Sequence, residues 1–123
     1  MGGGGGKGLF KGTRGARSNY TIQRGLQDKH IVGTNNYKLE ISNGKTPSLL
    51  TEDAKSLLRE RAGKGVMINV DKEWADFGRV IGKYYDSNTG TYVDTTKGFI
   101  HYDKKGGAHI VPSKPTGQWK KGG

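Results

Sequence analysis

Cysteine is absent from the 123 residues, so the chain can form neither a disulfide framework nor a thiolate metal site. No apolar run is long enough to span a membrane, and no apolar segment is typical of a signal peptide. Hydrophobic residues make up only 31% of the chain, and the first fifteen positions contain almost none. We therefore expect one soluble domain with a modest core that begins at about Leu26.

Acidic residues are few beside the 21 lysines and arginines, and the net charge is +10. The cation excess lies in residues 1–50 and 79–123, whereas residues 51–78 are close to neutral. A charge of this size exceeds the magnitude of about 2–8 that keeps a small domain soluble. It predicts a polyanionic partner, above all a nucleic acid, held through counterion release.

Metal-ligating patterns are also missing. The chain contains no H-E-x-x-H motif and no paired-acid or Cys/His spacing, although Asp86, Asp94 and Asp103 could come together on folding. We therefore expect chemistry without a metal or another cofactor. The chain has three histidines in all, His30, His101 and His109, so a mechanism that uses two of them has few possible assignments.

Two of these histidines lie in the stretch from Lys97 to Pro115, which predicts a β-hairpin around a Gly-bearing turn. Side chains alternate along a strand, so the loop length decides which groups share a face. A two-residue loop separates His109 from His101, and an odd-length loop or a bulge would bring them together. With a two-residue loop, the face with more catalytic chemistry carries Ile100, Tyr102, Lys104, His109 and Val111. We therefore rank His109 above His101.

The N-terminal half predicts helical elements. Residues 1–24 are expected to form a flexible basic arm or a plain linker, and residues 25–33 a short helix or turn. His30 in that turn either caps the element or points into the site. Residues 34–47 predict turns with a short strand at 37–41. Residues 48–62 predict the best helix, which packs on the sheet after an N-cap at Thr51 or Ser48.

The C-terminal half predicts strands at residues 65–70, 77–86 and 91–96 before the hairpin, with a turn at 71–76 and a basic tail at 118–123. In the second strand, Arg79, Ile81, Lys83 and Tyr85 would share a face. Cations beside a ring suit a nucleic-acid surface, and an ordinary amphipathic strand would show the same pattern. The elements together predict an α+β domain over residues 25–117, with helical elements on a four- or five-stranded antiparallel sheet.

Four runs carry a family resemblance: KHIVGTNNY (29–37), GKTPSLL (44–50), DFGRVIGKYYD (76–86) and GTY…TTKGFIHYDKKGGAHIVPSKP (90–115). They resemble the polymorphic toxin type 50 domain, also called bacterial toxin 50, which is similar to the barnase/EndoU/colicin/RelE-like (BECR) ribonucleases. The resemblance covers about residues 26–115, and the IHY…K.G.HIVP pattern is its most specific part.

The resemblance implies a helix-then-sheet fold and metal-independent cleavage of tRNA or another RNA, by attack of a ribose 2′-OH on the adjacent phosphate. It also implies delivery as the C-terminal part of a secreted effector or phage particle. The domain would then act in the cytoplasm of a target cell. A neutralising immunity protein, acidic enough to cover the basic cleft, would be a partner.

The same chemistry can be assigned to residues. Histidine suits acid and base work near neutral pH, and lysine or arginine stabilises a charged phosphorane. We expect His30 and His109 to be the acid–base partners, with His101 as a substitute if a bulge turns it toward them. The expected phosphate- or substrate-binding groups are Lys29, Ser48, Arg79, Lys83, Thr96, Tyr102 and Lys104.

Two other functions remain open at this point. A non-catalytic nucleic-acid-binding module would need only the basic arm and the aromatic–cationic strand. A structural segment of a phage or secreted particle would use the same charge against packaged nucleic acid. Cleavage of RNA by the purified protein would distinguish the first function from these two.

Overall fold

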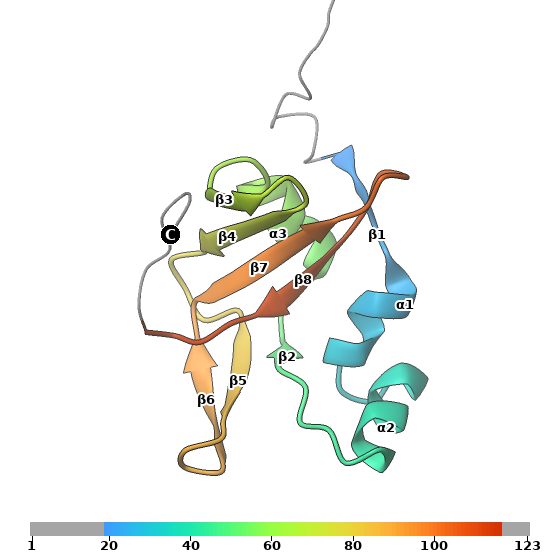
Figure 1. Ribbon diagram of the computed structural model, residues 1–123, viewed down its shortest axis with the longest axis vertical. Helices are drawn as coiled ribbons and strands as arrows, with labels where there is room; N and C mark the ends of the chain where they lie inside the picture. The colour runs from blue at the N-terminus through green and yellow to red at the C-terminus, as the bar shows by residue number, and fades with distance from the viewer. Residues whose placement is uncertain (1–18, 117–123) are drawn as a thin grey trace, which may run out of the picture.

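Helices and strands alternate with turns over residues 19–116, which are the residues that the computed structural model describes (Figure 1). The order along the chain is β1 (Thr21–Ile22), α1 (Arg24–Gln27), the 3-10 helix η3 (Asp28–His30), α2 (Asn35–Ser42), β2 (Leu49–Leu50), α3 (Ala54–Arg61), β3 (Val66–Asn69), β4 (Lys72–Asp76), β5 (Gly82–Asp86), β6 (Thr91–Thr95), β7 (Lys97–Tyr102) and β8 (Gly107–Pro112). The expected α+β class is confirmed.

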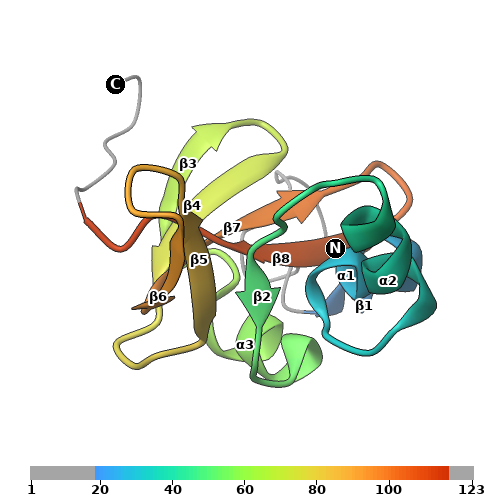
Figure 2. The same cartoon turned by 90° about the horizontal axis from the view of Figure 1, so that it is seen from below.

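The strands form two sheets instead of the expected single one. The larger sheet has the order β1-β8-β7-β4-β3, and the smaller sheet has the order β2-β5-β6. The larger sheet is also not wholly antiparallel, because β1 pairs with β8 in the parallel sense. Helix α3 lies on one face of the larger sheet, while α1 and α2 lie beside its β1–β8 edge (Figures 1 and 2).

The main core lies between α3 and the larger sheet. Leu57 and Leu58 of α3 and Ile100 and Ile110 of the central strands have no exposed surface. The strand residues are direct partners across β7 and β8, so they form one apolar row under the helix. The opposite face of these strands is therefore the one on which polar side chains can lie.

Helix α3 begins later than expected. Leu49 and Leu50 form β2, which pairs with β5, and Asp53 caps the helix by accepting a hydrogen bond from the Ser56 N–H at 2.9 Å. The predicted N-caps at Ser48 and Thr51 are thus wrong. Gly82 permits this pairing, because a Cβ at that position would lie 2.0 Å from the Leu49 carbonyl oxygen.

Three other local predictions need correction. Residues 37–41 are helical, because the Thr34 side chain caps α2 by accepting from the Tyr37 N–H. Residues 72–76 form strand β4 instead of a turn, and they pair with residues 97–101 of β7. Residues 77–81 precede β5, which starts only at Gly82. In each case tertiary pairing or a side-chain cap outweighs the local sequence signal.

A buried carboxyl group joins the helix to the sheet. Glu73 of β4 has no exposed surface and accepts hydrogen bonds from the backbone N–H of Gly63 and of Gly65, at 3.0 and 2.7 Å. The Tyr102 hydroxyl of β7 also donates to Glu73, at 2.5 Å. The turn that follows α3 is therefore held against β4 and β7 by one side chain.

Part of the expected N-terminal arm belongs to the fold: Thr21 and Ile22 form β1, and residues 1–18 lie outside the described residues. The expected basic tail at 118–123 lies outside them as well. Within residues 19–116, no helix is long and apolar enough to cross a membrane.

Candidate active site

The length of the hairpin loop between β7 and β8 decides which side chains of the two strands share a face. The Asp103 N–H donates to the Gly107 carbonyl at 2.8 Å, which leaves Lys104, Lys105 and Gly106 as a three-residue loop. Gly106 has a φ of +86°, the left-handed conformation that closes such a loop and that glycine adopts without strain. The loop is of odd length, and the predicted two-residue loop is wrong.

The odd loop places His101 and His109 directly opposite each other on one face of the sheet. Their ring centroids are 4.9 Å apart, and the ring planes differ by 16°. Tyr102, which we expected on the face of His109, points to the core side and is 7% exposed. Tyr102 is therefore not placed at the row as the expected substrate-binding group, because its hydroxyl is bound to Glu73 on the core side of the sheet.

The third histidine reaches the same face from the N-terminal half. The ring of His30 lies 6.4 Å from the ring of His109, with 19° between their planes. The three imidazoles thus form a row, which we call the histidine row: His30, His109 and His101. The first two were expected as partners, and His101 joins them through an odd-length loop, which is one of the two routes that the sequence left open.

A side-chain amide fixes the helical turn that carries His30. Gln27 is fully buried, donates from Nε2 to the Ile110 carbonyl at 2.9 Å, and accepts from the Ile110 N–H at 2.7 Å. This pair of bonds replaces the strand partner that β8 lacks beyond β1. Because His30 follows Gln27 by one turn, the amide places its ring beside His109.

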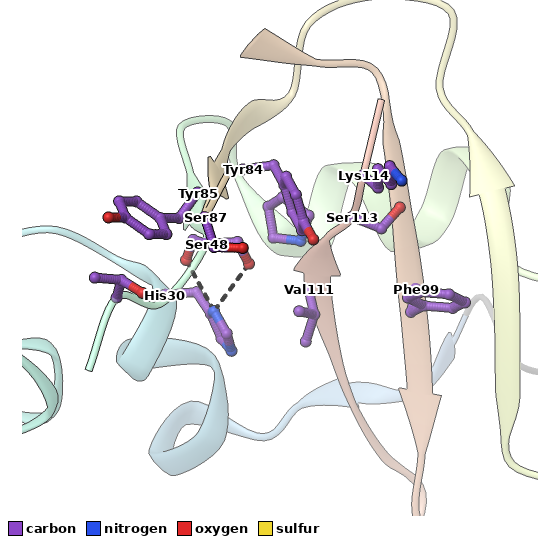
Figure 3. A pocket seen from close by; sticks show the side chains of 11 residues that line it. His30, Ser48, Tyr84, Tyr85, Ser87, Phe99, Val111, Ser113 and Lys114 are labelled. Atoms are coloured by element: carbon purple, nitrogen blue, oxygen red, sulfur yellow. Dashed lines mark hydrogen bonds between the residues drawn. The ribbon is translucent and has the colours of Figure 1, made fainter. Parts of the chain in front are cut away.

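Ser48 orients the ring of His30. The Nδ1 atom lies 2.9 Å from the Ser48 carbonyl oxygen, which can only accept, so Nδ1 carries the hydrogen (Figure 3). In neutral His30, the Nε2 atom therefore holds the lone pair and is the nitrogen available for proton transfer. The Ser48 hydroxyl lies near the same Nδ1, at 3.4 Å, so the residue acts on His30 from its backbone and its side chain.

Burial and mutual proximity keep the histidine row neutral. Burial is the main cause that lowers the pKa of His109 to about 4, and His101, His30 and Lys29 lower it further. Burial also lowers the pKa of His30, against the opposing effects of the Ser48 carbonyl and Glu40. Burial lowers the pKa of His101 as well, with Lys72 as the next cause. At neutral pH each ring can accept a proton.

Two lysines flank the row. Lys29 precedes His30 and acts electrostatically on both His30 and His109. Lys72 lies opposite His101 in the register of β4 and β7, and its ammonium nitrogen lies 4.4 Å from the centre of the Phe99 ring. Lys72 is not among the residues expected at the site, because the local sequence predicts a turn at residues 71–76. Only the pairing of β4 with β7 reveals the strand, and alternation along it then places Lys72 on this face.

The remaining predicted binding residues are not gathered at the row. The Arg79 guanidinium is held by Glu60 and Glu52, at 2.8 and 2.9 Å, and the Lys83 ammonium lies 2.7 Å from Asp94. Thr96 hydrogen-bonds Asp76 and lies before β7, at the end opposite His101. These ion pairs engage Arg79 and Lys83, the two cations that we expected to bind a phosphate. Lys104 also lies away from the histidine row, exposed at the tip of the β7–β8 loop.

The histidine row is accessible from two sides. His101 and His109 line a shallow hollow of about 80 Å³, and His30 lines a larger pocket on the other side. In the described part of the chain, no three His, Cys, Asp or Glu side chains are grouped so that they could hold a metal ion.

The fold and the site define a small basic α+β domain with three adjacent histidines on one sheet face. A comparison with protein-family models matches residues 22–112 to the family described as Bacterial toxin 50. The chain belongs to this family, which makes it a bacterial toxin domain, and the resemblance seen in the sequence is confirmed. Neither the comparison with curated proteins nor the comparison with solved structures finds a significant match.

Proposed function

We propose that this toxin domain is a metal-independent endoribonuclease and that the histidine row carries out its acid–base chemistry. The observation that supports this most strongly is the adjacency of His30, His109 and His101, from two distant parts of the chain, between Lys29 and Lys72. Imidazoles beside fixed positive charges are what cleavage of a ribose–phosphate linkage requires.

The proposed reaction is a transesterification. One imidazole removes the proton of a ribose 2′-OH, and the oxygen attacks the adjacent phosphorus to form a pentacoordinate phosphorane. The bond to the 5′-oxygen then breaks, and a second imidazole donates a proton to that oxygen. The products are a 2′,3′-cyclic phosphate and a free 5′-OH. Each such proton transfer typically contributes about 10²–10⁴ in rate.

The environments of the rings suggest their roles. His109 is the proposed base, because its pKa of about 4 keeps it neutral at pH 7. His30 is the proposed acid, because burial lowers its pKa but the Ser48 carbonyl and Glu40 oppose that lowering and favour its protonated form. A bound phosphate adds negative charge and raises the pKa of neighbouring imidazoles, so His30 would gain its proton in the complex. His101 would support His109 from the other side.

The wider setting of the proposal comes from the family and the charge. A toxin domain with a BECR-like helix-and-sheet arrangement would be delivered in a larger effector or phage particle and would act on tRNA or another RNA in the target cytoplasm. A net charge of +10 supports an RNA substrate. It also supports an acidic immunity protein as the partner that protects the producing cell.

Expression of the chain in a bacterium, with wild type beside His109→Ala, tests the proposal. We expect growth arrest and RNA fragments with cyclic phosphate ends from the wild type, and neither from the variant. The purified wild type should cleave RNA equally well in EDTA. Complete loss of cleavage in EDTA would refute the metal-independent mechanism. Binding of RNA without cleavage would refute catalysis in favour of a nucleic-acid-binding module.

A further inference from the structure

A pocket of about 630 Å³ adjoins the histidine row on the side of His30 (Figure 3). Its size is within the range of roughly 300–1,000 Å³ that is usual for small-ligand sites. It lies where the smaller sheet meets the ends of β7 and β8, and His30 and Ser48 form one side of it. The proton-transfer chemistry proposed above uses His30 at one side of the pocket and gives no role to the aromatic residues that line the rest of it.

The walls of the pocket are aromatic. Tyr84 and Tyr85 of β5 and Phe99 of β7 line it, together with Val111 of β8. In the view of Figure 3, His30 and Phe99 stand on opposite sides of the pocket. Flat rings that surround a space of this size provide stacking surfaces for another flat ring, and every nucleobase has such a face.

The register of the hairpin fixes the separation between the pocket and the row. Phe99 and Val111 are paired partners, as are His101 and His109, and the two pairs lie two residues apart on the same face. Two residues of a strand span about 6.8 Å. A phosphate at the histidine row and a base in the pocket would thus be joined by one ribose.

Two consecutive residues, Ser113 and Lys114, bring polar groups to the pocket (Figure 3). Lys114 is exposed and lines the pocket, where its ammonium can meet a phosphate. Ser113 also lines the pocket, is 6% exposed, and its hydroxyl has no hydrogen-bond partner among residues 19–116. Buried hydroxyls are normally paired, so a polar base edge at this wall would supply a partner that the fold leaves out.

We propose that this pocket is a nucleobase subsite, which takes an unpaired base next to the phosphate to be cleaved. A base in a duplex is paired and stacked, and an unpaired base can turn out into a pocket. The inference rests on the proposed function for its link to cleavage. It deepens that function by naming the substrate as single-stranded RNA or the loop of a structured RNA.

Binding and cleavage are measured separately to test the subsite. The binding probe is a short 2′-O-methyl oligouridylate, which cannot undergo the reaction. It is compared with an abasic oligomer that has the same number of phosphates, by fluorescence anisotropy at one salt concentration. The variant is Tyr84→Leu, with Tyr84→Phe as its conservative partner. Tyr37→Leu is the matched control, because Tyr37 does not line this pocket.

We expect the wild type and Tyr37→Leu to bind the oligouridylate roughly 10- to 100-fold more tightly than the abasic oligomer, as stacking on an aromatic ring predicts. Tyr84→Leu should bind the two nearly equally, and Tyr84→Phe should keep most of the preference. Equal binding of both oligomers by the wild type would overturn the subsite, whether or not the protein cleaves RNA.

Cleavage assays separate failure of the subsite from failure of the proposed function. We expect the wild type to cut single-stranded RNA at least tenfold faster than the same sequence in a duplex. Equal cleavage of both forms would overturn the subsite and leave the ribonuclease in place. Base-dependent binding without any cleavage would leave the subsite and remove the ribonuclease.

Discussion

His101 and His109 face each other across β7 and β8, with their ring centroids 4.9 Å apart and 16° between the ring planes. Two imidazolium ions at this distance repel, so at most one ring of the pair is positively charged over most of the pH range. His30 extends the pair to a row on the side of His109. A proton on one ring of the row therefore disfavours protonation of its neighbours.

Replacement of each histidine by asparagine should separate the roles in the row. We expect His109→Asn and His30→Asn each to lower the rate of RNA cleavage by about 10²–10⁴, because each removes one proton transfer. His101→Asn should have the smaller effect. The measurement is single-turnover cleavage at saturating protein, with circular dichroism as the control for folding. Full activity of His109→Asn would contradict the assignment of the base.

The stability of the domain should depend on pH in the acid range. In the unfolded chain histidine titrates near 6.5, and in the fold the pKa of His109 is lowered to about 4. Between these values the unfolded chain binds more protons, so the free energy of unfolding rises with pH. The contribution is present above about 6.5 and is lost as the pH falls toward 4. Urea unfolding at several pH values measures the slope of the unfolding free energy against pH.

The matched variant for this slope is His109→Asn, which removes one of the depressed groups. We expect a shallower dependence of the unfolding free energy on pH in the variant than in the wild type. His30 and His101 should maintain part of the slope, because burial lowers their pKa values as well. The same slope in both proteins would show that the pKa of His109 is not depressed.

Gln27→Leu should lower both stability and activity. The change leaves the N–H and C=O of Ile110 without their partners, and a buried unpaired group costs about 1–3 kcal/mol in the free energy of unfolding. It also releases the turn that places His30 beside His109. We expect a loss of stability on the order of 2–3 kcal/mol and a loss of cleavage in the fraction that remains folded. Gln23→Leu, at an exposed position one turn earlier, is the control and should change neither.

Glu73→Gln should destabilise the fold through the turn after α3. Three donors meet the two carboxyl oxygens of Glu73, and an amide offers only one accepting oxygen. We expect a loss of about 1–3 kcal/mol in the free energy of unfolding, measured by thermal or urea unfolding. Glu52→Gln is the surface control, since an exposed ion pair is worth about 0–1 kcal/mol. Equal effects of the two changes would contradict the structural role of Glu73.

The features that could be predicted from the sequence depend on local patterns. The hairpin over residues 97–115, the apolar stripe of α3 and the β5–β6 loop at residues 86–90 follow from periodicity and turn residues. Strand β4 and helix α2 could not be recognised in this way. The first depends on pairing with β7, and the second is started by one hydroxyl of Thr34.

The sequence by itself determined that a histidine-based acid–base site has only three imidazoles available, that the domain is basic, and that it resembles a family of bacterial toxins. Only the tertiary structure decided which groups meet. The left-handed Gly106 makes the hairpin loop odd and so joins His101 to His109. Gln27 brings His30 to them by binding Ile110, 83 residues away. Composition and periodicity are local properties, whereas strand register and long-range hydrogen bonds depend on the packing of the whole chain.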